Sequence, residues 1–163
     1  MAKILDAAEN FLPQYEPKVK FRYILYMPGM VASYIVKSAS RPKIKMNSYK
    51  IDYMNGYRNY AGKGEWDPMP VDLFDPISPS GSQMVMDWMR LCYDFLSGKA
   101  GYSDVYKKDI TLNMISPQNE VIEEWVLHGA FIEDADFGKV DYSASEAAEI
   151  SLSIKYDYAD LKF

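Results

Sequence analysis

Hydrophobic and polar residues alternate with a two-residue period along much of this chain, which is the pattern of β-strands with one buried face. The clearest run covers residues 149–158, where Ile150, Leu152 and Ile154 alternate with serine and charged residues. Shorter runs predict further strands at residues 19–27, 31–37, 69–74, 108–115 and 121–127, and residues 125–132 also have the character of a sheet strand. We therefore predict a mainly β protein.

Two more strand candidates, residues 49–54 and 57–61, flank Asn55 and Gly56. This dipeptide readily supplies the two positive φ angles of a type I′ turn, so we predict a tight hairpin. Tyrosine and methionine crowd its tip, where polar residues would be usual. Either the hairpin folds back on its own core, or it projects and docks on a neighbouring subunit.

One segment has the period of a helix instead. Its apolar stripe consists of Met84, Trp88, Leu91, Cys92 and Phe95. Ser80 and Gln83 stand at capping-box spacing before it, and Gly98 is the predicted end. Such a one-sided helix is expected to cover a sheet.

The chain is predicted to have an arm and one domain. Residues 1–17 contain a short apolar pattern that Pro13 and Pro17 interrupt, so we expect an N-terminal arm there. Residues 18–163 form the single predicted domain, because 163 residues with 48% hydrophobic content bury one core of ordinary size.

Composition narrows the functional classes. The formal net charge of −5 argues against a dedicated nucleic-acid binder, which would carry a basic excess. The single cysteine, Cys92, excludes an intrachain disulfide and fits folding in a reducing compartment. No run approaches the roughly 20 apolar residues of a membrane-spanning helix. We expect an intracellular, soluble protein without a membrane anchor.

The net charge conceals an asymmetry along the chain. Residues 18–63 contain ten basic residues against one acid, Asp52, whereas residues 120–149 contain nine acids against one base, Lys139. The two segments are either unrelated solvated faces or the two sides of a head-to-tail contact between copies of the chain. Composition leaves both interpretations open.

We find no pattern of residues that predicts catalysis. His128, the only histidine, lies inside a predicted strand and is expected to be structural. Cys92 lies on the apolar stripe of the helix, where a thiol is usually a small buried hydrophobe. No segment has the spacing of a metal site or a phosphate-binding loop. We therefore expect no enzymatic activity, no catalytic or metal-binding residues and no cofactor.

Several short motifs, in this order and spacing, carry a resemblance to a known family. They are Lys37-Ser-Ala-Ser-Arg-Pro42, Tyr53-Met-Asn-Gly-Tyr57, Trp66-Asp-Pro-Met-Pro-Val71 with Asp75-Pro76, Tyr106-Lys-Lys-Asp109, Trp125-Val-Leu-His-Gly-Ala-Phe131, Phe137-Gly138 with Asp141-Tyr142, and Tyr156-Asp-Tyr158. Through them, the chain beyond the arm resembles the tail tube protein of contractile-tailed bacteriophages.

The resemblance implies a fold and an assembly. The expected fold is a β-sandwich or barrel with one flanking α-helix, formed by residues 18–163. Six copies would form a ring with a continuous inner β-barrel, and stacked rings would form the inner tail tube, a conduit for genome ejection.

The resemblance also implies partners and a location. The expected partners are further copies of the chain, the tail sheath protein, the baseplate hub, the tape measure protein and the tail terminator. Double-stranded DNA would pass through the lumen without specific binding, and the protein would be assembled in the host cytoplasm into the virion tail.

Two surfaces are candidates for the contacts of such an assembly. The candidate inter-ring interface consists of Lys43, Lys45, Met46, Tyr49, Lys50, Tyr53, Met54, Asn55, Gly56, Tyr57 and Tyr60. The candidate acidic contact or lumen surface consists of Glu120, Glu123, Glu124, Glu133, Asp134, Asp136 and Asp141. An acidic or neutral lumen would let phosphate pass.

Two alternatives to a phage tail tube stay open. The first is the inner tube of a headless contractile injector or a type VI secretion system, which shares the fold. The second is a ligand-binding β-sandwich, which only the abundance of tyrosine supports.

Overall fold

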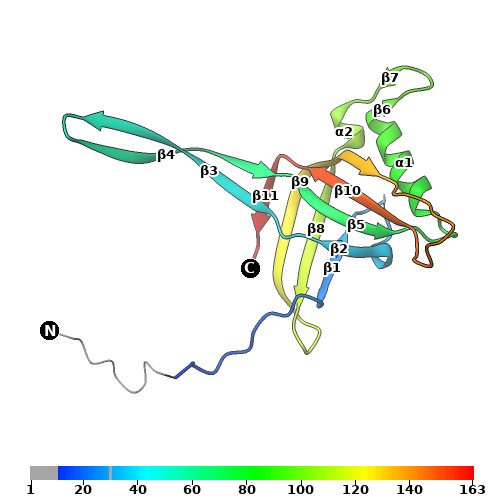
Figure 1. Ribbon diagram of the computed structural model, residues 1–163, viewed down its shortest axis with the longest axis horizontal. Helices are drawn as coiled ribbons and strands as arrows, with labels where there is room; N and C mark the ends of the chain where they lie inside the picture. The colour runs from blue at the N-terminus through cyan, green and yellow to red at the C-terminus, as the bar shows by residue number, and fades with distance from the viewer. Residues whose placement is uncertain (1–10, 30) are drawn as a thin grey trace.

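The computed structural model describes residues 11–29 and 31–163, and these form mainly β-structure (Figure 1). The main strands are β1 (Tyr23–Tyr26), β2 (Val36–Ala39), β3 (Lys43–Tyr53), β4 (Gly56–Asp67), β5 (Met69–Phe74), β8 (Lys108–Ile115), β9 (Val121–Asp136), β10 (Glu149–Lys155) and β11 (Tyr158–Leu161). The remaining elements are a 3-10 turn (Ser33–Ile35), α1 (Gly81–Cys92), the short strands β6 (Tyr93–Asp94) and β7 (Lys99–Ala100), and α2 (Ser103–Tyr106).

Seven strands form one antiparallel sheet that folds into two layers. Its order is β1-β8-β9-β10-β5-β2, and β11 pairs with the first half of β9. The long strand β9 belongs to both layers, because its first half pairs with β8 and β11 and its second half pairs with β10. The predicted sandwich with a flanking helix is therefore confirmed.

The change of layer along β9 occurs at a glycine. Gly129 has a φ of 66°, a left-handed conformation that side chains disfavour. A Cβ atom at this position would stand 2.2 Å from an Asp157 carboxylate oxygen. Only glycine fits here without a shift of that side chain.

The core lies between the layers and follows the predicted alternation. Ile150, Leu152 and Ile154 of β10 are buried against strands β5 and β9, while Ser151 and Ser153 face outward. The helix α1 joins this core through Val85 and Trp88, both completely buried. The Trp88 indole N–H donates a hydrogen bond to the Tyr106 carbonyl at 2.9 Å, which ties α1 to α2.

The predicted start of the helix is confirmed, but its predicted end is wrong. Ser80 caps α1 by accepting a hydrogen bond from the Gln83 backbone N–H at 3.3 Å. The helix ends at Cys92 instead of Gly98, because residues 93–100 form the small hairpin β6–β7. Phe95 therefore lies beyond the helix and is exposed.

Several predicted strands have different bounds. Strands at 69–74 and 108–115 are confirmed, but residues 19–27 shorten to β1 and residues 31–37 become a 3-10 turn followed by β2. The predicted strands at 121–127 and 125–132 are one strand, β9, that extends to residue 136, and the run 149–158 divides into β10 and β11. In the part of the chain that the structure describes, no helix has the length and apolar character needed to cross a membrane.

Candidate assembly surfaces

The hairpin β3–β4 is a long ribbon that extends away from the body of the molecule (Figure 1). Its two strands pair with each other and with no other strand among the described residues. Tyr53, Met54 and Tyr57 at its tip are 74%, 89% and 64% exposed. The interpretation in which the hairpin folds back on its own core is therefore wrong, and the projecting hairpin is confirmed.

The turn differs from the predicted type I′ turn. Tyr53 pairs with Gly56, so the central residues are Met54 and Asn55. Met54 has a positive φ of 42°, whereas neither Asn55 nor Gly56 has one. The turn lies one residue earlier than predicted, so that at the tip β3 ends one residue earlier and β4 begins one residue earlier than predicted.

Near its root, the ribbon is apolar on the face that continues the protein core. Ile44 pairs with Trp66, and Met46 pairs with Gly64 across the strands. The Trp66 ring packs against the buried Tyr156 at a centroid distance of 6.0 Å. The opposite face is charged, and there Lys43 forms an ion pair with Asp67 at 2.8 Å.

The apolar side chains change face at a β-bulge between Met46 and Ser48. Because side chains alternate along β3, Tyr49, Ile51 and Tyr53 share the face of the root's charged residues. Tyr49 stacks on its partner Tyr60 with ring centroids 5.6 Å apart.

This tip apolar face, composed of Tyr49, Ile51, Tyr53 and Tyr60, has exposed fractions between 42% and 74%. It borders a hollow of about 550 Å³. The root's apolar face is partly covered by the protein's own core, whereas the tip apolar face is not.

The lysines of the candidate interface are partly engaged within the hairpin. Lys50 forms an ion pair with Asp52 at 2.9 Å and lies over the Tyr57 ring, 5.0 Å from its centroid. Hydrogen bonding to Asp67 raises the pKa of Lys43 above its ordinary value. Lys45 forms no ion pair within the described residues.

The seven candidate acids do not form one surface. Glu120 lies in the turn between β8 and β9, Glu133, Asp134 and Asp136 lie at the far end of β9, and Asp141 lies in the following loop. Since a strand rises about 3.3 Å per residue, the 16-residue β9 is roughly 50 Å long. This length separates the acids into distinct regions.

Glu123 is buried, with 5% of its surface exposed, and therefore does not belong to an exposed acidic surface. Its carboxylate accepts hydrogen bonds from Lys18, from Trp125 at 2.6 Å and from Arg41 at 3.4 Å. Burial acts to raise the pKa of Glu123, but the hydrogen bonds from Lys18 and Trp125 and the nearby positive charges outweigh it. The pKa lies below its ordinary value.

Some charges of the basic segment and the acidic segment thus pair with each other inside one chain. Lys18 and Arg41 of the basic segment pair with Glu123, and Lys37 pairs with Glu149 at 2.5 Å. Only the remaining charges are available for a contact between copies.

The outward face of the layer β2-β5-β10 has an acidic centre composed of Asp72, Asp134 and Asp136, of which only Asp72 was not among the predicted acids. Asp72 accepts hydrogen bonds from Ser38 at 2.7 Å and from Ser151 at 2.9 Å, and these bonds hold its pKa below the ordinary value. Asp134 and Asp136 face the same side, opposite Ser153 and Ser151. The outward positions of alternating strands were the signal that could have identified Asp72.

The two residues considered as catalytic candidates, His128 and Cys92, lie in surroundings typical of structural residues. His128 stacks on Tyr158 with ring centroids 4.6 Å apart, and its Nδ1 lies 3.2 Å from an Asp109 carboxylate oxygen. Burial raises the pKa of the Cys92 thiol, which disfavours the nucleophilic thiolate. Among the described residues, no three histidine, cysteine or acidic side chains gather as metal ligands do.

Comparison by sequence finds no matching protein family and no matching curated protein. Comparison of folds finds clear similarity to solved structures. A chain of the anti-feeding prophage cap, described as the tube-terminating cap, matches with a TM-score of 0.75 at 15% identity, over 97% of this chain and 99% of that chain.

Two structures of an extracellular contractile injection system are also similar. A chain of the sheath/tube terminator matches with a TM-score of 0.72 at 16% identity, over 91% of this chain and 99% of that chain. A chain of the sheath-tube complex matches with a TM-score of 0.66 at 16% identity, over 90% of this chain and 91% of that chain. The chain therefore has the fold found among tube and terminator proteins of contractile injection systems.

Proposed function

We propose that this chain is a structural protein that polymerises as stacked hexameric rings into the inner tube of a contractile injection particle. One observation carries the proposal: the projecting hairpin presents an apolar tip that no part of its own body covers. A tip with exposed tyrosine and isoleucine is a typical contact surface between subunits. The fold shared with tube and terminator proteins supports the same proposal.

The partners follow from this role. In the assembled particle, the tube would contact further copies of itself, a sheath protein and a baseplate hub. A tape measure protein would set its length, and a terminator would close its end. The acidic centre around Asp72, Asp134 and Asp136 would face the lumen, where negative charge keeps phosphate-bearing cargo from sticking.

The proposal has a phage version and a headless version. In the phage version, the tube conducts double-stranded DNA from a capsid into the host, and the protein belongs to the virion tail after assembly in the host cytoplasm. In the headless version, no capsid is present. The anti-feeding prophage and the extracellular injection system among the similar structures favour the headless version. Electron microscopy of particles from the producing cell distinguishes the two by the presence of a DNA-filled capsid.

A second candidate function is that of the terminator itself. It is favoured by the two highest TM-scores quoted above, which belong to chains from cap and terminator structures. A terminator would form single rings that do not stack, whereas a tube protein would stack without limit.

Negative-stain electron microscopy of the purified chain tests the proposal. We expect rings of six subunits and hollow tubes that lengthen with protein concentration. Single rings at all concentrations would support the terminator function, and compact monomers at all concentrations would contradict both.

A further inference from the structure

The strands β1 and β2 end the seven-stranded sheet on its two open edges. β1 pairs only with β8, and β2 pairs only with β5, so each leaves one edge without a neighbouring strand in the described chain. Between them lies a groove of about 820 Å³. Free strand edges of this kind are places where a further extended chain can pair.

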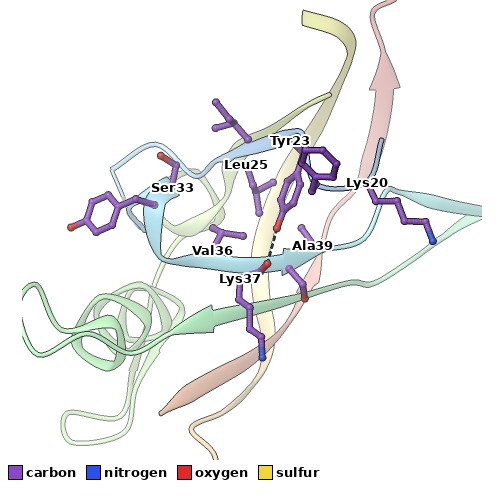
Figure 2. Close-up of a pocket in the computed structure, with 11 residues that line it drawn as sticks. Lys20, Tyr23, Leu25, Ser33, Val36, Lys37 and Ala39 are labelled. Carbon is purple, nitrogen blue, oxygen red and sulfur yellow. Dashed lines mark hydrogen bonds between the residues drawn. The ribbon is translucent and has the colours of Figure 1, made fainter. Parts of the chain in front are cut away.

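The groove has an apolar floor, and among the residues that the structure describes one side-chain hydrogen bond crosses it. Figure 2 shows Tyr23 reaching from β1 to the backbone carbonyl of Lys37 on β2, at 2.9 Å. Leu25 and Val36 lie in the same gap, and both belong to or pack against the core. Phe21 and Tyr34 at the rim are 77% and 71% exposed. The groove thus has apolar side chains for an apolar occupant, and a side-chain hydrogen bond instead of a paired strand joins its two sides.

The same chain carries an extended apolar segment that its own body does not cover. The predicted arm, residues 1–17, begins outside the described residues. Its described part, residues 11–17, contains no helix or strand and is exposed throughout. Phe11, Leu12 and Tyr15 are 76%, 82% and 64% exposed. Pro13 and Pro17 favour extended backbone, so little entropy is lost when the arm is ordered.

The arm is directed away from the groove of its own chain. Lys18 is held by the buried Glu123, and the Arg22 side chain donates to the Ser116 and Pro117 carbonyls at 3.2 and 3.3 Å. These contacts fix the root of the arm near the turn between β8 and β9, and Figure 1 shows the arm leaving the body there. Seven extended residues reach about 23 Å, which is enough to contact another subunit.

We propose that the arm of one protomer lies in the groove between β1 and β2 of a second copy of the chain. Leu12 and Tyr15 would bury apolar surface against the floor, Glu16 would approach Lys20 at the rim, and backbone groups of the arm would pair with the free edges. The contact rests on the proposed function, because it joins neighbouring subunits of the assembly. The arm contact between neighbouring subunits would be additional to the proposed contact of the hairpin tip.

Cross-linking between two single-cysteine variants tests the proposal. In the Cys92→Ser background, tagged Leu12→Cys is mixed with untagged Tyr34→Cys, assembled and mildly oxidised. A link between the two variants can form only between different chains. We expect the tagged-untagged dimer to exceed by about tenfold the dimer that Leu12→Cys forms with Val140→Cys, since docking raises the local concentration to the millimolar range. Val140 is the matched control because it is 91% exposed and lies outside the groove.

The outcomes separate this inference from the proposed function. If rings or tubes form but the Leu12 and Tyr34 variants link no better than the control, the arm exchange is overturned and the tube function stands. If neither rings nor links form, both are overturned. A truncated chain that lacks residues 1–16 provides a second test. Its tubes should dissociate at a several-fold higher subunit concentration than wild-type tubes. Dissociation at the wild-type concentration would contradict the arm contact.

Discussion

At the scale of single residues, two glycines have the same left-handed backbone conformation but differ in how closely other atoms surround them. Gly129 and Gly98 both have left-handed φ angles, 66° and 69°. A Cβ atom at Gly129 would meet the Asp157 carboxylate, whereas a Cβ atom at Gly98 would meet nothing within 4 Å. The first position therefore has a steric requirement that the second lacks.

We predict that Gly98→Ala lowers the free energy of unfolding by about 1–2 kcal/mol, the cost of left-handed backbone. Gly129→Ala should cost more, because Asp157 must also move and its ion pair with Lys107 is disturbed. Urea unfolding of both variants measures the difference. Equal losses would show that Asp157 moves without cost.

The buried Glu123 predicts a pH dependence. Its pKa in the folded protein lies below the ordinary value of 4.5, so its stabilising contribution is complete above pH 4.5 and is lost as the pH falls through the folded value. We expect Glu123→Gln to be less stable than wild type by about 1.5–3 kcal/mol at pH 7, with the gap narrowing toward pH 3. Glu133→Gln, an exposed acid on the same strand, is the control. A gap that is constant with pH would refute this role.

At the scale of elements, the alternation of side chains predicted the strands that have one buried face. Residues 69–74 and 108–115 were found because buried and exposed positions follow each other without interruption. The predicted strands for β9 end at residue 132, because the acidic residues Glu133, Asp134 and Asp136 that follow are unusual in strands, although the backbone pairing continues to residue 136. The hairpin strands were underestimated because their root residues are rich in lysine and glycine, which are unusual in strands.

The candidate surfaces could be predicted only in part from the sequence. The dipeptide Asn55-Gly56 identified the hairpin, and the tyrosines around it indicated a contact surface, but a sequence does not display the bulge at which the apolar residues change face. The acids were grouped by proximity in sequence, although the extension of β9 separates them and tertiary ion pairs bury Glu123. Asp72 was missed because its serine partners come from two distant strands.

The two faces of the hairpin tip predict different effects on assembly. Ile51→Ser with Tyr53→Ser removes apolar contacts, and we expect tube formation to be lost. Below the concentration at which the wild type assembles, the melting temperature should change by no more than about 2 °C, since these side chains are exposed. Asp52→Ser with Asn59→Ser alters the opposite face of the same ribbon and should leave tubes intact. Negative-stain microscopy and thermal melting measure both pairs. Loss of tubes in both would show that the two faces contribute alike.

At the scale of the whole molecule, assembly and stability are linked. Subunits that bind the folded chain stabilise it by mass action, so the melting temperature should rise with protein concentration. We expect this rise for the wild-type chain and its absence for the Ile51→Ser, Tyr53→Ser variant. Differential scanning calorimetry across a hundredfold range of concentration measures it. A concentration-independent melting temperature in the wild type would argue against polymerisation.

The whole molecule also divides its contacts between those made inside the chain and those left for other copies. Glu123 and Glu149 use three basic residues of the opposite charge segment, which fixes the arm root and the start of the hairpin. The hairpin tip and the groove between β1 and β2 remain uncovered. Such a division lets one chain fold first and assemble afterwards.

Strand β9 has a consequence for how the protein opens. Because one continuous strand carries ladder hydrogen bonds of both layers, neither layer can separate without breaking bonds that position the other. Amide protons on both halves of β9 should therefore exchange with solvent deuterium at the same slow rate, through global unfolding alone. The amides of the projecting ribbon, which is tied to the body only at its root, should exchange far faster in the free subunit and become protected when subunits assemble.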